Sequence, residues 1–280
     1  MTDIVGDIVG DFDRDGFALL KGFYDLAEDI SPIHEGVRRI VELLGRKHGI
    51  DAPCATAHEA MMQGYPALIK CNRAWGGVVY DAVKQIPAFL KLVSNIRNNR
   101  LFEQLRPGST PGVAAGGYGI RIDNPCEEKY RAPWHQEFPA QLRSLDGVVF
   151  WSPLLEVTPA MGPVEIAVGS HKDGLVPVFE DGGEAGKTGA YAMRLERETE
   201  RISRYERLAP LTKPGDLLVM DFLTLHQSGL NQASNPRWSM QFRYFNFIDP
   251  LGVRIDWKGS FAANEKFGDI LPELKGQGRC

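Results

Sequence analysis

Cysteine is scarce in this sequence and shows no paired spacing. The 280 residues contain four cysteines, and no two of them form a CxxC pair. This pattern excludes a disulfide-rich scaffold and a cysteine-based zinc finger. An uninterrupted apolar run of the roughly 18 residues that a membrane crossing needs is also missing. The N-terminal segment, MTDIVGDIVGDFDRDG, is acidic and lacks the basic and then apolar order of a secretory signal. We therefore expect a cytoplasmic protein.

An excess of positive charge is absent as well. The chain has 32 Lys and Arg against 36 Asp and Glu, which gives a formal net charge of −4. This balance argues against nucleic acid and against a membrane surface as partners. The phosphate-binding glycine loop and the GxSxG motif of serine hydrolases are missing too. Hydrophobic residues make up 43% of the chain, which is typical of a folded globular protein.

The first half of the chain carries helical periodicity. Apolar residues recur at the spacing of one helix face over residues 31–49. Ser31 supplies a cap at the start of this helix, and Gly49 supplies a stop. A second helix is predicted over residues 87–105. Ahead of both, the run GFALLKGF at residues 16–23 is bounded by glycines and predicts a short strand.

The second half of the chain is rich in short strands separated by turns. Glycine, proline, asparagine and aspartate are dense in this part of the sequence. The predicted strands are 117–122, 147–154, 162–168, 216–222 and 240–248. Many short strands preceded by a helical layer favour a β-sandwich or jelly roll with helices packed on the outside.

The predicted fold class is therefore α+β, with a jelly-roll or cupin-like core. We expect one domain over residues 1–280, with a helical layer mainly at 24–106 and a β-core mainly at 107–250. A separate helical domain followed by a β domain is the alternative, but it would leave the strand at 16–23 isolated among helices. Residues 176–206 are polar and charged, and we interpret them as a long insertion between strands.

Two histidines and one carboxylate are spaced like part of a metal site. In PWHQEF, His135 and Glu137 are two residues apart, so on an extended strand both side chains project from the same face. His226 follows the strand at 216–222, in DFLTLHQSG. Two histidines and one carboxylate form the facial triad of non-haem Fe(II) oxygenases. The alternative is a chance HxE, because six histidines in 280 residues produce such a pair fairly often.

The sequence around these residues resembles a known family. PWHQE, VVFW, MGPVEIAVGSH and KPGDLLVMDFLTLHQSGLNQASNPRWSMQFRYF, taken in order, are similar to the motifs of the phytanoyl-CoA dioxygenase family. The resemblance extends from about Asp13 to about Phe247. It implies a double-stranded β-helix fold and a dioxygenase that uses Fe(II), 2-oxoglutarate and O2. It further implies that a small molecule is oxidised, by hydroxylation or another outcome, with release of succinate and CO2.

The resemblance assigns the metal ligands one residue at a time. His135 and His226 match the two metal-binding histidines of the family. Glu137 stands where most members have aspartate. It keeps the charge and the oxygen donor but adds one methylene, and we interpret it as the third ligand. A carboxylate at this position argues against the related halogenases, which have glycine or alanine there.

Co-substrate residues follow from the same resemblance. Arg237 matches the arginine that binds the distal carboxylate of 2-oxoglutarate, for which a planar and permanently charged fork is suited. Arg243 competes with Arg237 for this role. Ser228 matches a hydroxyl that contacts the same carboxylate, although a simple turn serine is equally consistent. Gln136 and Trp151 match positions that line the co-substrate pocket, and for Trp151 a core aromatic is the alternative.

Two further residues are weaker candidates. Arg121 could point into the barrel, whereas His171, in the GSH motif, is expected to support the fold. The function alternatives are a non-catalytic metal-binding β-barrel and a cupin-type metal-dependent hydrolase or isomerase, neither of which needs 2-oxoglutarate. The substrate cannot be deduced from the sequence, and the family name is not evidence for phytanoyl-CoA.

Overall fold

Two antiparallel sheets form the centre of the protein. The computed structural model describes residues 7–180, 193–259 and 266–276. In the larger sheet, the strands run in the order β1 (Phe17–Leu20), β9 (Leu217–Asp221), β4 (Val148–Pro153) and β11 (Arg237–Asn246). β11 also pairs with β2 (Pro111–Val113) and β3 (Gly119–Asp123) at its two ends. The smaller sheet has the order β10 (His226–Ser228), β5 (Val164–Ala167) and β8 (Arg207–Leu208).

Alternation along β11 separates a helix-covered face from an inner face. Trp238, Met240, Phe242 and Tyr244 are buried in one hydrophobic cluster with residues of the N-terminal helices. The residues between them point to the opposite face, because side chains alternate along a strand. Side chains alternate in the same way along β4 and β9. Val149 of β4 and Met220 of β9 belong to a second hydrophobic cluster, which lies on the inner face. The inner face of the larger sheet therefore faces the smaller sheet.

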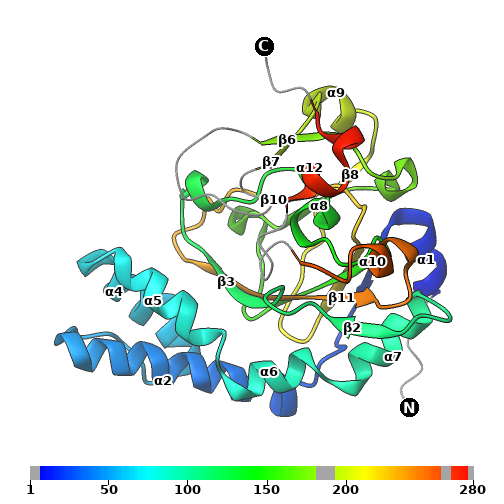
Figure 1. Ribbon diagram of the computed structural model, residues 1–280. Helices are drawn as coiled ribbons and strands as arrows, with labels where there is room; N and C mark the ends of the chain where they lie inside the picture. Colours follow the sequence, from blue (N-terminus) through cyan, green and yellow to red (C-terminus); the bar gives the residue numbers. More distant parts are fainter. Residues whose placement is uncertain (1–6, 181–192, 260–265, 277–280) are drawn as a thin grey trace.

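The helices cover the outer face of the larger sheet, as Figure 1 shows for α2, α6 and α7. Helices of the first 105 residues are α1 (Ile8–Asp15), α2 (Ser31–His48), α3 (Ala57–Glu59), α4 (Tyr65–Cys71), α5 (Ala74–Val83), α6 (Pro87–Val93) and α7 (Ile96–Leu105). Short helices follow later in the chain: α8 (Glu137–Gln141), α9 (Glu198–Ile202), α10 (Pro250–Arg254) and α12 (Phe267–Ile270). Nowhere in the described ranges does a helix combine the length and apolar character that a membrane crossing requires.

The first predicted helix begins earlier than expected. A π-helical turn, Leu26–Ile30, leads directly into α2, and its cap is Asp25, which accepts from the backbone N–H groups of Ala27 and Glu28. Ser31 is therefore inside the helical segment and does not cap it. The predicted stop is confirmed, because Gly49 has a left-handed backbone with φ 66°.

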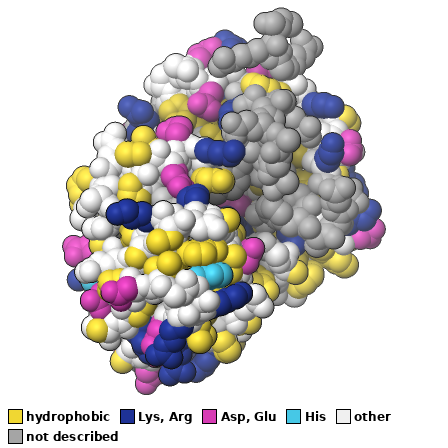
Figure 2. All heavy atoms as spheres, turned by 90° about the vertical axis from the view of Figure 1, so that its left-hand side faces the viewer, with side chains coloured by type: hydrophobic (Ala, Val, Ile, Leu, Met, Phe, Trp, Pro, Cys, Tyr) yellow, Lys and Arg dark blue, Asp and Glu magenta, His cyan; other side chains and the backbone are white. Residues whose placement is uncertain are grey.

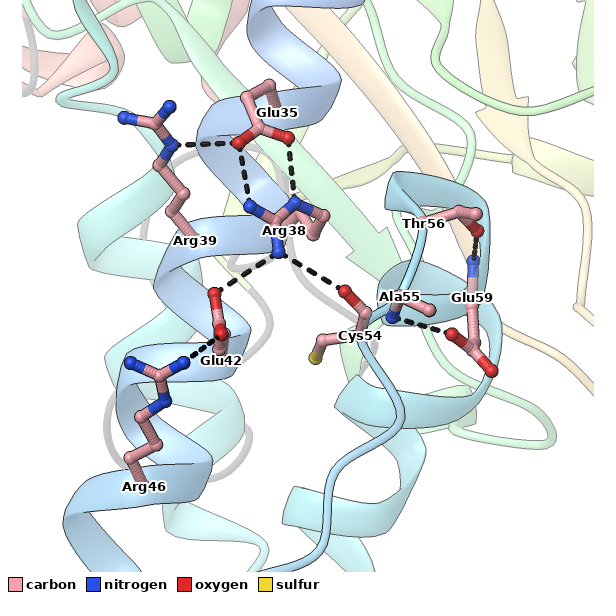
Figure 3. A network of polar contacts seen from close by, with 9 residues as sticks. All are labelled: Glu35, Arg38, Arg39, Glu42, Arg46, Cys54, Ala55, Thr56 and Glu59. Atoms are coloured by element: carbon pink, nitrogen blue, oxygen red, sulfur yellow. Dashed lines mark hydrogen bonds and ion pairs between the residues drawn. The ribbon is translucent and has the colours of Figure 1, made fainter.

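Ion pairs cover the exposed face of α2 (Figure 3). Glu35 pairs with both Arg38 and Arg39, and Arg38 also pairs with Glu42 one turn further along. Exposed pairs of this kind contribute little to stability. Arg38 additionally donates to the carbonyl of Cys54 at 3.2 Å, and this contact fixes the segment that follows the helix.

The second predicted helix is two helices, because the chain breaks at Ser94 and Asn95. Asn95 has an extended backbone and caps α7 by accepting from the N–H of Arg97. The buried side chain of Asn98 donates to the carbonyl of Leu92 at 2.8 Å, which provides a partner for the end of α6. Apolar periodicity continues through the break, and for that reason the sequence pattern alone predicted a single helix.

The predicted strands are all present, with shifted ends. β11 begins at Arg237, three residues before the predicted start at 240. The segment predicted as a long insertion, 176–206, contains β6 (Val178–Glu180), β7 (Met193–Leu195) and α9. Its residues 181–192 lie outside the described part of the chain.

Candidate metal centre

His135 and His226 are neighbours although 91 residues separate them in sequence. Their backbones form an antiparallel bridge, in which each N–H donates to the carbonyl of the other residue at 3.0 and 3.1 Å. The two imidazole rings have centroids 4.3 Å apart. The bridge extends β10, so the smaller sheet places both rings side by side.

Glu137 is at a junction between extended chain and helix. The expectation that it lies on a strand with His135 is wrong, because Glu137 is the first residue of α8. Gln136 between them is nonetheless extended, with φ −99° and ψ 150°, so the two side chains still point the same way. The Glu137 N–H donates to the carbonyl of Phe222 at 2.8 Å and thereby fixes the start of the helix.

These three side chains converge on one point. Oε2 of Glu137 lies 3.8 Å from Nε2 of His135 and 3.7 Å from Nε2 of His226. One potential ligand atom from each residue lies within 4.8 Å of the others, and all three residues are buried. The predicted metal ligands are therefore brought together.

The histidine nitrogens are oriented for metal binding. Nδ1 of His135 is 2.7 Å from the carbonyl of Pro133, and Nδ1 of His226 is 2.9 Å from the carbonyl of Thr224. A carbonyl can only accept, so both Nδ1 atoms carry a proton, and in the neutral imidazole Nε2 is then the nitrogen that can bind a metal. Burial, reinforced by the neighbouring His226, lowers the pKa of His135 and favours the neutral form that binds metals.

The Glu137 carboxylate is ionised and incompletely partnered. Burial alone would raise its pKa, but Arg243 and the two histidines outweigh this effect and hold the pKa well below its usual range. Oε1 accepts from Nε of Arg243 at 2.9 Å. Oε2 is buried and has no hydrogen-bond partner among the described residues. Two imidazoles and a buried carboxylate oxygen without a hydrogen-bond partner are a donor set that fits a divalent metal ion.

A cavity of about 300 Å³ adjoins the triad. It lies between the two sheets, because Val149 and Gln241 of the larger sheet and Val164 of the smaller sheet line it. Tyr80 of α5 and Lys84, the residue directly after this helix, also contribute to its wall. The cavity therefore offers space for small molecules directly beside the three candidate ligands.

Only some of the predicted co-substrate residues line this cavity. Trp151, Ser228 and the weaker candidate Arg121 line it. Gln136 does not, because its amide donates to the carbonyls of Gly174 and Leu223, both at 2.7 Å, and accepts from the N–H of Val176. His171 also lies elsewhere, with Nε2 3.2 Å from the carbonyl of Asp13.

Arg237 and Arg243 lie on the same inner face of the unbroken strand β11 but have different partners. Arg243 lines the cavity and contacts Glu137. Arg237 is 1% exposed and donates to Asp123, with Nη2 at 2.9 Å. Arg121 donates to the same carboxylate. Nη1 of Arg237 and Oγ of Ser239 are buried without partners in the described chain.

Sequence reasoning did not identify two contacts at this centre. Nothing in MQFRYF indicates that Arg243 would contact Glu137, because the pairing joins segments 106 residues apart. Asp123 was missed as well. Asp123 directly follows the predicted strand 117–122 and lies two residues after Arg121, which was an available signal because both side chains share one face if the strand continues.

Comparison with known proteins gives a family and a fold. A model of the family described as phytanoyl-CoA dioxygenase (PhyH) matches residues 12–239. No curated protein sequence matches the chain significantly. The match covers the segment that contains both histidines, Glu137 and Arg237.

Similar solved structures include three proteins with low sequence identity. EctD from S. alaskensis, solved with 2-oxoglutarate and 5-hydroxyectoine, is 18% identical with a TM-score of 0.55, over 85% of this chain and 74% of its own. AviO1 from Streptomyces viridochromogenes Tue57 is 18% identical with a TM-score of 0.55, over 89% and 98%. SnoK, a non-haem α-ketoglutarate-dependent carbocyclase from nogalamycin biosynthesis, is 15% identical with a TM-score of 0.55, over 87% and 85%. These likenesses confirm the predicted α+β class with a jelly-roll core.

Proposed function

Since this chain belongs to the phytanoyl-CoA dioxygenase family, we propose that it is an Fe(II)- and 2-oxoglutarate-dependent dioxygenase that oxidises a small molecule. The observation that carries the proposal is the convergence of His135, Glu137 and His226 beside a cavity. EctD crystallised with bound Fe and with 2-oxoglutarate supports the choice of both groups.

The three converging side chains would hold the iron. Both imidazoles are fixed by backbone carbonyls and present Nε2, and the Glu137 carboxylate presents Oε2. Three protein ligands would leave room at the metal for small molecules from the adjoining cavity. When bound, Fe(II) together with 2-oxoglutarate supplies the oxidation by O2, with release of succinate and CO2.

Arg237 is the proposed anchor for the distal carboxylate of 2-oxoglutarate. Arg237 does not line the cavity, and its Nε and Nη2 donate to Asp123. The family resemblance nevertheless favours it over Arg243, whose guanidinium holds the metal ligand Glu137. Arg237 retains a buried and unpartnered Nη1 within the described residues, and Ser239 on the same face retains an unpartnered hydroxyl. Ser228 and Trp151 line the cavity and would contact the co-substrate there. Gln136 is assigned to fixing its own segment, because the backbone engages its amide fully.

The substrate is proposed to be a small molecule that enters the cavity. Among similar structures, EctD is solved with 5-hydroxyectoine and the epimerase SnoN with nogalamycin RO. Figure 2 shows acidic and basic side chains interspersed over one face of this protein, with apolar side chains between them. Such a face gives no support for nucleic acid as the partner.

Succinate release tests the proposal. Purified protein is incubated with Fe(II), 2-oxoglutarate and O2, and a panel of small molecules is screened for compounds that accelerate succinate formation. We expect activity that depends on Fe(II) and is abolished in His135→Ala and His226→Ala, because each variant removes a ligand. Full turnover by either variant would show that the triad is not the metal centre.

The rival functions give different results in the same experiment. A metal-binding barrel or a cupin-type hydrolase would bind a divalent metal through the same triad but would neither bind nor consume 2-oxoglutarate. Arg237, with its buried and unpartnered Nη1, favours the dioxygenase over both.

A further inference from the structure

The two oxygens of the Glu137 carboxylate have different surroundings. Oε1 accepts a hydrogen bond from Nε of Arg243 at 2.9 Å. Oε2 faces Nε2 of His135 and of His226 and has no hydrogen-bond partner in the described part of the chain. One oxygen is thus held by an arginine, and the other is directed to the centre of the triad.

Arg243 is itself held in place from two sides. It lies on β11, opposite Val149 of β4, and its backbone carbonyl accepts from the N–H of Ala114 at 2.9 Å. Its Nη1 donates to the carbonyl of Gly117 at 3.1 Å. Gly117 is closely packed, because a Cβ there would lie 2.8 Å from Oε1 of Gln141. The Arg243 guanidinium is therefore held in place, and it orients the Glu137 carboxylate through the hydrogen bond to Oε1.

We propose that Arg243 is a positioning residue of the metal centre, which holds Oε1 of Glu137 so that the carboxylate binds the metal through Oε2 alone. This inference rests on the proposed function and concerns how the third ligand is presented. A carboxylate that used both oxygens would occupy one more coordination position. Glutamate suits this arrangement because its length allows one oxygen to reach the arginine while the other reaches the metal.

Binding of Co(II) alone to the metal-free full-length chain tests this role without a substrate. Arg243→Met keeps an unbranched apolar stem but removes all donors of the guanidinium. We expect Co(II) affinity to fall about 10- to 100-fold, as is usual when the partner of a metal ligand is lost. We also expect the visible absorption spectrum of bound Co(II) to change, because a released Oε1 alters the coordination of the ion.

Arg237→Met is the matched control. Arg237 lies on the same face of the same strand, is also buried, and also pairs with a carboxylate, but that carboxylate belongs to Asp123. Both variants therefore remove one arginine from a buried acid, although Asp123 keeps Arg121, and a general loss of stability would appear in both. Only Arg243→Met should alter the affinity for Co(II) and its spectrum.

Glutamate shortening provides a second test. Glu137→Asp should weaken Co(II) binding in the wild-type background. The shorter side chain cannot accept a hydrogen bond from Arg243 with one oxygen and bind the metal with the other. In the Arg243→Met background this conflict is gone, so we expect the double variant to bind no more weakly than the weaker single variant. Additive losses would show that the two residues act independently and would overturn the inference.

Arg243→Lys keeps the experiment decisive if Arg243→Met does not fold. Lysine can donate to Oε1 but cannot also reach the Gly117 carbonyl, so we expect an intermediate affinity and a spectrum like that of the wild type. Wild-type affinity and spectrum in the Met variant, or a changed spectrum in the Lys variant, would overturn the role of Arg243 and leave the triad intact. A wild-type chain that binds no Co(II) would instead contradict the proposed function.

Discussion

Asp123 is the residue on which two buried arginines depend. It accepts from Arg121 and from Arg237, and both arginines are less than 10% exposed. Burial alone would raise the pKa of Asp123, but the two arginines outweigh burial and hold the pKa well below its usual range. Removing one partner of such a cluster leaves charge buried without compensation.

Asp123→Asn is therefore expected to lower the free energy of unfolding by about 3–5 kcal/mol at pH 7. A carboxyl group whose folded pKa is depressed stabilises the protein above its unfolded pKa of about 3.9, and this contribution is lost as the pH falls further. The difference in free energy of unfolding between wild type and variant should thus be constant from pH 7 to pH 5 and shrink below about pH 4.

Urea unfolding across this pH range measures the difference in free energy of unfolding between wild type and Asp123→Asn. The control is Asp81→Asn, whose exposed pair with Lys84 should contribute little. A difference that grows as the pH falls would contradict the assignment.

Arg237→Lys tests the proposed anchor at the same scale. The substitution keeps the charge but loses the planar fork, which leaves Nη1 for the co-substrate while Nε and Nη2 donate to Asp123. Loss of one charge-assisted bond costs about 1.5–3 kcal/mol, which corresponds to roughly 10- to 150-fold weaker binding of 2-oxoglutarate. Calorimetric titration of 2-oxoglutarate into the metal-loaded chain, without O2, gives the affinity. Were Arg243→Lys to weaken this binding while Arg237→Lys left it unchanged, the anchor would be Arg243.

At the scale of elements, the break between α6 and α7 depends on a single buried amide. Asn98 accepts from the hydroxyl of Tyr24 at 2.9 Å and donates to the carbonyl of Leu92. Asn98→Leu leaves the hydroxyl of Tyr24 buried without a partner, at about 1–3 kcal/mol, and leaves the carbonyl of Leu92 with only backbone donors such as the N–H of Asn95. We expect a loss of about 2–4 kcal/mol in urea unfolding, whereas Asn95→Ala, which removes only a cap, should cost about 1 kcal/mol. Equal effects of the two variants would show that the buried amide does not hold the break.

Elements with a local physical cause could be predicted from the sequence, and those fixed by distant contacts could not. Gly49 ends α2 through its left-handed backbone, a signal that is present in the sequence itself. The break before α7 escaped prediction because Asn98 acts on carbonyls of the preceding helix and on Tyr24, 74 residues away. The junction at Glu137 escaped for a similar reason, since its backbone partner is Phe222.

For the whole molecule, pairing between segments far apart in sequence assembles the site. The prediction of a single domain over residues 1–280 is supported by β1, whose residues pair with β9 of the central sheet. It stays a prediction. His135, Glu137 and His226 could be named from their motifs, whereas the contact of Arg243 with Glu137 required the register of β11. Motifs thus indicated a metal-dependent oxidation, whereas the register of the sheet determined that Arg243 contacts Glu137.

The most direct test of the central claim is the binding of 2-oxoglutarate to the whole chain in the absence of O2, with and without Fe(II). No substrate is needed, so the result does not depend on identifying one. We predict tight binding only when Fe(II) is present, and loss of that binding in His226→Ala, because the co-substrate needs both the metal and the cavity. Binding that is equally strong without Fe(II), or no binding to the Fe(II)-loaded chain, would contradict the assignment as a 2-oxoglutarate-dependent dioxygenase.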